Sequence, residues 1–299
     1  MQYQQLGRSA LHISRIGLGC MSFSASRESE AIQIIHQALH LGINYFDTAD
    51  LYEKGLNETL VGKALRTKRE RAIIATKVGN QWRPDGSEWD WNPRKKYILK
   101  AVEESLVRLQ TDCIDLYQLH GGTIDDPIDE VIETFERLQK EGKIRYYGIS
   151  SIRPNVIREY VKRSNIVSVM TQYSLADRRP EETVLDLLKD NKMGVLARGT
   201  LAKGLLVNKP ATEYLGHSEA DIAGAAQLVQ GVAVTTHTAA QTAIQFVLQH
   251  PAITSAVLGI SRMQHLMEVV TTTDKYDLSP KDLELLKDVL PAKLYEQHR

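Results

Sequence analysis

The stretch "NYFDTADLYEKGLNETL" (residues 44–60) begins as a buried strand and then presents polar side chains where that strand ends. The apolar run 43–46 is followed at once by Asp47, and Tyr52 comes in the loop that leads to the next helix. A carboxylate and a phenol are not needed to turn a chain out of a hydrophobic core, since ordinary turn residues do this. The stretch therefore predicts a strand–loop–helix unit with a polar site at the carboxyl end of its strand.

The same unit recurs along the chain, because short apolar runs alternate with helical periods. The expected strands are 16–20, 43–46, 72–76, 114–119, 144–149, 167–171, 194–197 and 253–258. Between the first two, apolar residues recur at the spacing of one helix face: Ala31, Ile34, Ile35, Ala38 and Leu39. Gly42 and Gly142 stand just before expected strands, where helices commonly end.

Repeated strand–helix units without a long linker predict parallel strands joined by helical crossovers. The alternatives are an open doubly wound sheet and a closed (β/α)8 barrel, the TIM barrel of α/β proteins. A length of 299 residues suits the barrel with two additions. These are an N-terminal β-hairpin over 2–14, turning at 7–9, and an extra C-terminal helix over 279–290. We expect one domain over residues 1–299, with a single long irregular segment at 199–235.

Composition narrows the classes of partner. Lys+Arg and Asp+Glu both number 37, so the formal net charge is zero and favours neither nucleic acid nor a membrane surface as a partner. The basic run 66–71 is interpreted as a solvated helix end. Two cysteines without a CxxC motif favour a reducing cytoplasm and argue against a metal–thiolate site. We therefore expect a cytoplasmic protein without a metal.

Four reactive side chains follow successive strands, at the end of a barrel where active sites lie. Asp47 and Tyr52 follow the second strand, Lys77 ends the third and His120 ends the fourth. A nearby ammonium favours the phenolate form of a tyrosine, and a carboxylate keeps that ammonium charged. Such a phenol can protonate a developing alkoxide while an imidazole donates a hydrogen bond to the same oxygen. Because no nucleophile is needed, hydride transfer to a carbonyl fits better than acyl transfer.

Each of these residues also has an ordinary structural interpretation. Asp47 alone would more often be a helix cap, Tyr52 a packing residue and His120 a structural histidine, while Lys77 could be a surface charge. Their placement on neighbouring strands of one rim favours the joint chemical interpretation over four independent structural ones.

Five blocks, in order, resemble the aldo-keto reductase family. They are "LGRSALHISRIGLGCMSF" (6–23), "FDTADLYEKGLNETLVGKAL" (46–65), "IDLYQLH" (114–120), "GKIRYYGISS" (142–151) and "VLGISRMQHLMEVV" (257–270). The chain is most similar to the branch that contains potassium-channel β subunits and bacterial general-stress reductases. The resemblance implies NADPH-dependent reduction of a small aldehyde or ketone, with Asp47, Tyr52, Lys77 and His120 as the catalytic tetrad and Tyr52 as the general acid. It also implies a monomer or weak homo-oligomer.

The resemblance further implies which residues bind NADPH or NADP. They are Cys20, Met21, Asp47, Ser150, Ser151, Gln172, Arg198, Gly199, Leu201, Lys203, Gly204, Ser261, Arg262, His265 and Glu268. Tyr52, Trp82 and His120 are expected to contact the substrate. Two positions depart from the family: Ser151 replaces an Asn, and Arg198 begins a segment where relatives often carry an aromatic ring that stacks on nicotinamide. Cofactor phosphates are expected to meet backbone amides of 203–206 and the helix start near Arg262.

Two other functions remain open at this point. One is a regulatory subunit that binds the nicotinamide cofactor and senses its redox state with little turnover, against which the intact tetrad argues. The other is a Schiff-base lyase that uses Lys77, against which the pairing of Lys77 with Asp47 argues.

Overall fold

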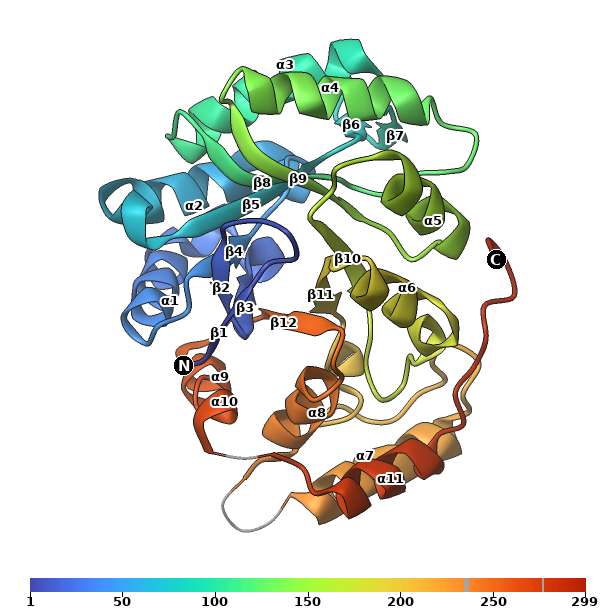
Figure 1. Cartoon of the computed structure of the whole chain (residues 1–299). Helices are drawn as coiled ribbons and strands as arrows, with labels where there is room; N and C mark the ends of the chain where they lie inside the picture. The colour runs from blue at the N-terminus through green and yellow to red at the C-terminus, as the bar shows by residue number, and fades with distance from the viewer. Residues whose placement is uncertain (234–236, 276) are drawn as a thin grey trace.

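The computed structural model describes residues 1–233, 237–275 and 277–299, and eight parallel strands in this part of the chain close into a barrel (Figure 1). Their order around the barrel is β10-β11-β12-β3-β4-β5-β8-β9. The strands are β3 Ile16–Gly19, β4 Tyr45–Asp47, β5 Ile73–Val78, β8 Ile114–Leu119, β9 Ile144–Ser150, β10 Ser168–Gln172, β11 Gly194–Arg198 and β12 Ile253–Gly259. The predicted (β/α)8 barrel is confirmed, and each strand boundary lies within two residues of its expected place.

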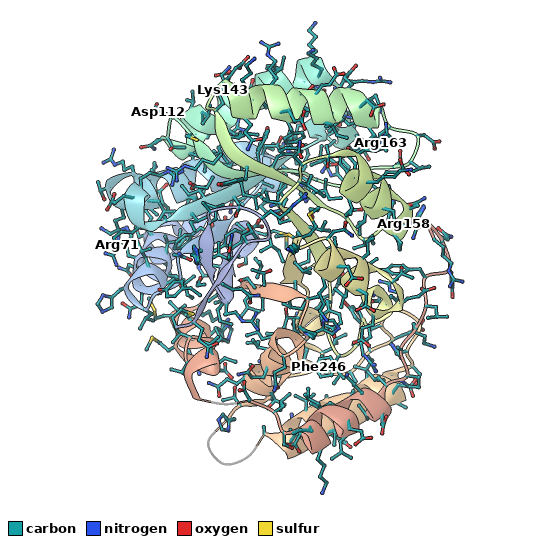
Figure 2. The ribbon with its side chains drawn as sticks, viewed as in Figure 1. Arg71, Asp112, Lys143, Arg158, Arg163 and Phe246 are labelled. Carbon is teal, nitrogen blue, oxygen red and sulfur yellow. The ribbon has the colours of Figure 1, made fainter. Side chains whose placement is uncertain are left out.

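Helices surround the barrel and turn their apolar faces toward it (Figure 1). They are α1 Glu28–His40, α2 Leu56–Leu65, α3 Lys95–Leu109, α4 Ile128–Lys140, α5 Pro154–Arg163, α6 Val184–Asp190, α7 Glu219–Val232, α8 Ala239–Leu248, α9 Met263–Val269, α10 Thr272–Lys275 and α11 Pro280–Val289. In Figure 2, Arg158 and Arg163 project from the outer face of α5, whereas Phe246 of α8 is buried and stacks on Tyr173. The helices thus supply an outer apolar core around the strands.

The interior of the barrel holds a separate apolar cluster, to which the N-terminal hairpin contributes. Strands β1 (Tyr3–Gln5) and β2 (His12–Ser14) pair antiparallel, as predicted. Leu6, Leu11 and Ile13 pack with interior strand residues Tyr45, Ala75, Leu116, Val167, Met170, Leu196 and Val257. At the hairpin turn, a Cβ on Gly7 would lie 2.1 Å from the Val167 carbonyl oxygen, and its φ is +55°, so only glycine fits. The hairpin therefore plugs the amino-terminal end of the barrel.

The two-residue alternation of side chains along the strands places polar side chains on the carboxyl-terminal side of this hairpin plug. Side chains alternate between the two faces of a strand, so every second residue faces the same side. Three polar residues stand two positions beyond interior apolar ones: Asp47 after Tyr45, Lys77 after Ala75, and Gln118 after Leu116. The core of the barrel thus becomes a polar site at the carboxyl ends of β4, β5 and β8.

The prediction that residues 199–235 form a long irregular segment is partly wrong. Residues 219–232 form helix α7, which packs beside α11, and 234–235 lie outside the described residues. Ser218 and Asp221 form a reciprocal capping box at the start of α7. This helix signal is present in the sequence, but the Gly, Ala and Thr content of the segment favoured an irregular structure. The predicted C-terminal helix is confirmed as α11, with Ser279 as its N-cap.

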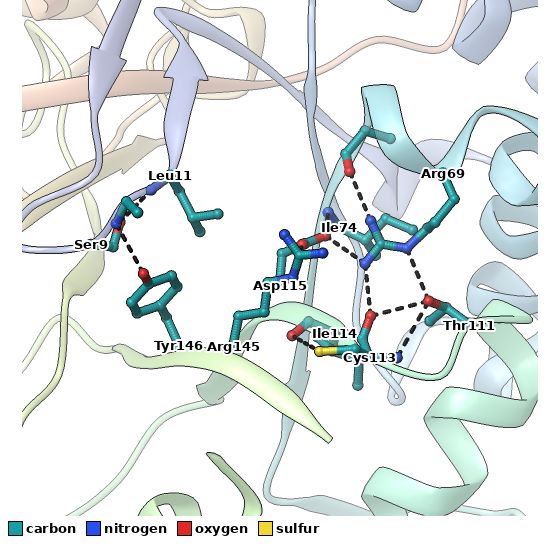
Figure 3. Close-up of polar contacts among 12 residues, drawn as sticks. Ser9, Leu11, Arg69, Ile74, Thr111, Cys113, Ile114, Asp115, Arg145 and Tyr146 are labelled. Carbon is teal, nitrogen blue, oxygen red and sulfur yellow. Dashed lines mark hydrogen bonds and ion pairs between the residues drawn. The ribbon is translucent and has the colours of Figure 1, made fainter. Parts of the chain in front are cut away.

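The prediction that the basic run 66–71 is a solvated helix end is also partly wrong, because the Arg69 side chain turns inward. Its guanidinium lies 2.7 Å from the buried carboxylate of Asp115, which also accepts from the Ile74 amide at 2.9 Å (Figure 3). Arg145 approaches the other oxygen of Asp115 at 3.3 Å. Asp115 therefore ties the starts of β5, β8 and β9 together.

We expect Asp115→Ala to lower the free energy of unfolding by about 3 kcal/mol, because it leaves a partly buried guanidinium without its counter-charge and the buried Ile74 amide without its acceptor. Urea unfolding followed by circular dichroism measures this. Glu88→Ala is the control, since Glu88 pairs with Arg83 at the surface, and it is expected to cost less than about 1 kcal/mol. Equal effects of the two substitutions would contradict the role given to Asp115.

Candidate active site

The centre of the polar site is an ion pair between two buried side chains, Lys77 and Asp47. The Lys77 ammonium contacts Asp47 Oδ1 and donates to the Thr48 carbonyl oxygen at 2.8 Å. The second oxygen of Asp47 accepts from Gln118 Nε2 at 3.3 Å and from the Tyr45 hydroxyl at 3.4 Å. The contacts join the ends of β4, β5 and β8, which are consecutive around the barrel, so the strand register fixes the pair.

Burial lowers the pKa of Lys77, but the Asp47 carboxylate more than offsets this, and the pKa lies above its usual value. Burial raises the pKa of Asp47, while the Lys77 ammonium and the hydrogen bonds to the carboxylate oppose that shift. The site therefore holds a fixed ammonium at neutral pH in surroundings that exclude water.

Tyr52 and His120 lie beside this ammonium. Lys77 Nζ is 5.2 Å from the centroid of the half-buried Tyr52 ring, and the rings of Tyr52 and His120 are 5.9 Å apart at 84°. Burial, followed by the charges of Lys77 and Arg198, lowers the pKa of His120 to about 3. The imidazole is therefore neutral near pH 7 and carries one N–H. The structure thus brings together the four residues predicted from the strand ends.

Next to the tetrad, Gln172 is held by partners that fix which way its amide points. Its Nε2 donates to Asp177 Oδ2 at 2.8 Å and to the Tyr214 hydroxyl at 3.2 Å, while its Oε1 accepts from Arg198 Nη1 at 3.0 Å. Asp177 is in turn held through both oxygens by Arg179, at 2.8 Å each. Arg198 thus lies at the rim, at the end of β11, with its guanidinium bound to Gln172.

The residues after β9 and β11 flank the same rim. Ser150 and Ser151 are buried at the end of β9. The segment after β11 contains the 3-10 turn Ala202–Gly204, in which Lys203 is exposed. The amides of Gly204 and Leu205 donate to the carbonyl oxygens of Leu201 and Ala202, at 2.8 and 3.0 Å. Because the turn closes on itself, these two amides already have partners within it, and the phosphate contact expected for the amides of 203–206 stays a prediction.

The residues predicted around the other end of the cofactor lie in the segments after β3 and β12, and those after β12 reach into α9. Arg262 is exposed at the N-cap of α9, and Ser261, His265 and Glu268 are partly exposed. A cavity of about 60 Å3 joins Ser261 to the 3-10 helix η1 (Cys20–Ser22) and to α1.

Cys20 and Met21, both in η1, differ in exposure. Met21 is 66% exposed, whereas the Cys20 thiol is buried in the outer core and its pKa is raised, first by burial. A thiol in this position packs against apolar side chains and has no access to a ligand at the rim.

Trp82 lies in a hairpin within residues 79–93, which join β5 to α3. Strands β6 (Asn80–Trp82) and β7 (Trp89–Trp91) pair antiparallel beside the Tyr52 loop. The Trp82 indole donates to the Leu51 carbonyl oxygen at 3.1 Å, and the Trp91 indole donates to Asp126 Oδ1 at 3.0 Å. Each of these two indole N–H groups thus has a partner, and the Trp82 ring is held half-buried beside the Tyr52 loop.

Sequence reasoning missed three residues that support the site. Gln118, which binds Asp47, stands two residues before His120, and the alternation of strand side chains would have pointed to it. Asn57 is fully buried and ties the loop after β4 to η1 through Thr48 Oγ1 at 2.7 Å and the Cys20 carbonyl oxygen at 2.8 Å. Asp177, which holds Gln172, follows β10 in a turn that carries no local motif.

Several buried polar atoms at this rim have no hydrogen-bond partner within the described part of the chain: His120 Nδ1, Gln118 Oε1 and Thr200 Oγ1. Unsatisfied buried groups cost free energy unless a bound molecule completes them. The donor set here, with hydroxyls, an amide and guanidinium groups, matches the amide and phosphate groups of a nicotinamide dinucleotide. The residues therefore fit such a cofactor.

The described residues lack two features that would indicate other classes of site. No cluster of three or more His, Cys, Asp or Glu side chains there has an arrangement suited to a metal ion. None of the helices in these residues combines the length and apolarity needed to span a membrane.

Comparisons with known proteins agree with this geometry. The model of the "Aldo/keto reductase family" matches residues 15–291. The chain is 48% identical to "Uncharacterized oxidoreductase YqkF" of Bacillus subtilis, covering 100% of both. It is 36% identical to "Aldo-keto reductase YhdN" of the same organism, over 72% of this chain and 66% of that protein.

Solved structures extend the likeness to three dimensions. The holo form of aldo-keto reductase AKR11C1 from Bacillus halodurans has 48% identity and a TM-score of 0.94, over 100% of this chain and 99% of that one. The glycerol dehydrogenase AKR11B4 from Gluconobacter oxydans has 25% identity and a TM-score of 0.87, over 99% and 98%. The barrel, the converging tetrad and these matches lead to one conclusion: the chain is an oxidoreductase of the aldo-keto reductase family.

Proposed function

We propose that this protein reduces small aldehydes or ketones to alcohols with NADPH, and that Tyr52 is the general acid. The observation that carries the proposal is the buried Lys77–Asp47 pair with Tyr52 and a neutral His120 beside it. The ammonium favours negative charge on the phenol oxygen as the proton leaves. A neutral imidazole donates a hydrogen bond without competing as a stronger acid.

Each residue of the proposed tetrad has its own role in the reduction. When bound, the cofactor supplies the hydride for the carbonyl carbon. The Tyr52 O–H gives its proton to the carbonyl oxygen, which becomes the alcohol hydroxyl, and His120 holds that oxygen by a hydrogen bond. Lys77 stabilises the phenolate that remains, and Asp47 keeps Lys77 charged and in place.

The residues around the rim support a nicotinamide dinucleotide at this site. Ser150, Ser151 and Gln172 offer hydroxyl and amide groups for the nicotinamide carboxamide, and Arg198 offers a planar guanidinium beside them. Lys203 and Arg262 offer positive charge for phosphates. The B. halodurans relative is described as a holo form, which supports a bound cofactor here. Met21, Gly199, Leu201, Gly204, Ser261, His265 and Glu268 complete the proposed contacts, with Cys20 limited to its backbone.

The proposed substrate contacts are Tyr52, His120 and Trp82, whose half-buried ring lies in the hairpin beside the Tyr52 loop. An aromatic wall beside a proton donor favours a small carbonyl with an apolar substituent. We further propose a cytoplasmic protein that is a monomer or weak homo-oligomer, with one domain over residues 1–299.

The direct test measures the fall in NADPH absorbance with a panel of aldehydes and ketones, repeated with NADH. Turnover of carbonyls with NADPH is expected. Tight NADPH binding with no turnover of any carbonyl would instead support a regulatory subunit that senses cofactor redox state.

Arg262→Ala is expected to weaken NADPH binding by roughly one to two orders of magnitude and to leave NADH binding nearly unchanged. The exposed Arg262 guanidinium lies next to Ser261, and a charge-assisted bond to the adenosine 2′-phosphate contributes about 1.5–3 kcal/mol. Fluorescence titration of both cofactors measures the two affinities. Lys281→Ala, at the start of α11, is the control for loss of one surface charge. Equal losses for both cofactors would show that Arg262 holds something other than the 2′-phosphate.

A further inference from the structure

Tyr52 is followed at once by three residues with left-handed backbone conformations. The φ angle is 47° at Glu53, 56° at Lys54 and 88° at Gly55. Side chains with a Cβ are disfavoured in this region, and two such residues in a row are unusual outside glycine. Strained residues of this kind persist only where the surrounding structure holds them. The contacts that hold this turn therefore also determine where Tyr52 lies.

One contact ties the turn to the loop that follows β3. The Glu53 carboxylate accepts a hydrogen bond from the Ala25 amide at 2.9 Å, at the start of the 3-10 helix η2 (Ala25–Arg27). Hydrogen bonds to an ionised acceptor are stronger than neutral ones. Glu53 thereby fixes the first left-handed residue to a neighbouring element of the barrel.

A second contact ties the turn to the hairpin β6–β7. Lys54 Nζ lies 5.1 Å from the centroid of the Trp82 ring, a cation–π geometry. The ammonium also lies against the hairpin turn, since a Cβ on Gly86 would be 2.7 Å from it. Arg83 braces this hairpin through Glu88 at 2.6 Å and Asp90 at 2.7 Å.

A third contact acts on the residue before Tyr52. The Leu51 carbonyl oxygen accepts from the Lys54 amide at 3.3 Å, which closes the turn, and from the Trp82 indole N–H at 3.1 Å. Tyr52 is therefore flanked on one side by a carbonyl bound to Trp82 and on the other by a residue bound to Ala25.

We propose that Glu53 and Trp82 are positioning residues that hold the Tyr52 hydroxyl in its productive place by bracing this left-handed turn. The inference rests on the proposed function of Tyr52 as general acid. Without either brace the turn can relax toward ordinary backbone conformations, and the phenol moves with it. A shift of about 1 Å at a reacting group can cost roughly 10²-fold in rate.

The kinetic test compares Glu53→Ala with Glu53→Gln, whose side-chain oxygen still accepts from Ala25. Glu53→Ala is expected to lower kcat roughly 10- to 100-fold with unchanged NADPH affinity, and Glu53→Gln to restore most of the rate. Glu141→Ala is the matched control and leaves kcat unchanged, because Glu141 pairs with Arg137 and Lys143 where α4 ends. Combined with Tyr52→Phe, Glu53→Ala is expected to have no further effect.

Trp82→Phe provides a second variant, since it keeps an aromatic ring and removes only the N–H that binds Leu51. It is expected to lower kcat in the same way. The inference is overturned if both Glu53→Ala and Trp82→Phe keep wild-type kcat. It is equally overturned if the loss in Glu53→Ala persists in the Tyr52→Phe background, because Glu53, unlike Trp82, is not a proposed substrate contact.

A readout without turnover separates this inference from the proposed function. In protein labelled with 13Cζ-tyrosine, the Tyr52 NMR signal is identified by its loss in Tyr52→Phe. Glu53→Ala is expected to shift that signal, whereas Glu53→Gln and Glu141→Ala leave it in place. A wild-type enzyme that turns over no carbonyl would contradict the proposed function alone, whereas an unmoved Tyr52 signal in Glu53→Ala would contradict the positioning role.

Discussion

Tyr52→Phe is expected to lower kcat by about 10²–10⁴-fold, which is the contribution typical of general acid catalysis. The phenol O–H is the proposed proton donor, and its neighbours do not replace it. His120 has its pKa lowered to about 3, so near pH 7 it is a neutral imidazole and a far weaker acid than imidazolium. The raised pKa of Lys77 likewise keeps its proton bound. Stopped-flow and steady-state measurements of NADPH oxidation with the best carbonyl of the panel give the rate.

The same substitution is expected to leave the fold and the cofactor affinity near wild type. Phenylalanine keeps the ring that faces His120 at 5.9 Å and lies over Lys77 at 5.2 Å, and only the hydroxyl is lost. Thermal unfolding and fluorescence titration with NADPH serve as controls. A variant that turns over within a few-fold of wild type would remove the phenol from the mechanism.

The fold could be predicted because each of its signals is local. The periods of two and 3.6 residues that separate strands from helices lie within short windows, and the barrel follows from their alternation. The exceptions have local causes too. Helix α7 begins at the capping box Ser218–Asp221, which was outweighed by the composition of the segment around it.

The tetrad could be predicted because parallel strands bring their carboxyl ends to one rim, so that chain order alone places Asp47, Lys77 and His120 together. The supporting contacts could not be predicted in this way. Gln172 is oriented by Asp177 and Tyr214, which lie on different loops whose approach depends on tertiary packing. The inward turn of Arg69 toward Asp115 was hidden for the same reason, because it joins the end of one helix to the start of a distant strand.

Lys77→Met is expected to abolish activity while keeping the length and most of the volume of the side chain. The variant lacks the charge that favours the phenolate of Tyr52, so loss of the proton from the phenol becomes unfavourable. Steady-state measurements of NADPH oxidation by the variant and by wild type give the loss of rate, and thermal unfolding shows whether the variant is folded. A folded variant that turns over within a few-fold of wild type would contradict the role given to the ammonium.

The free energy of unfolding of the same variant is expected to change with pH in a definite direction. In wild type the raised pKa of Lys77 contributes stability that is present below its unfolded value of 10.5 and is lost as pH rises through the folded value. In Lys77→Met that contribution is absent, and burial raises the pKa of Asp47 above its unfolded value of 3.8 against only the hydrogen bonds from Gln118 and Tyr45. The folded state then binds a proton that the unfolded state releases, so stability falls as pH rises above that value, by about 1.4 kcal/mol per pH unit until Asp47 ionises. Urea unfolding at several pH values measures the slope. The double variant Asp47→Asn/Lys77→Met has no carboxylate to ionise at this position, so it is expected to lose this slope while remaining inactive. If the slope remains in the double variant, the pH dependence does not come from Asp47.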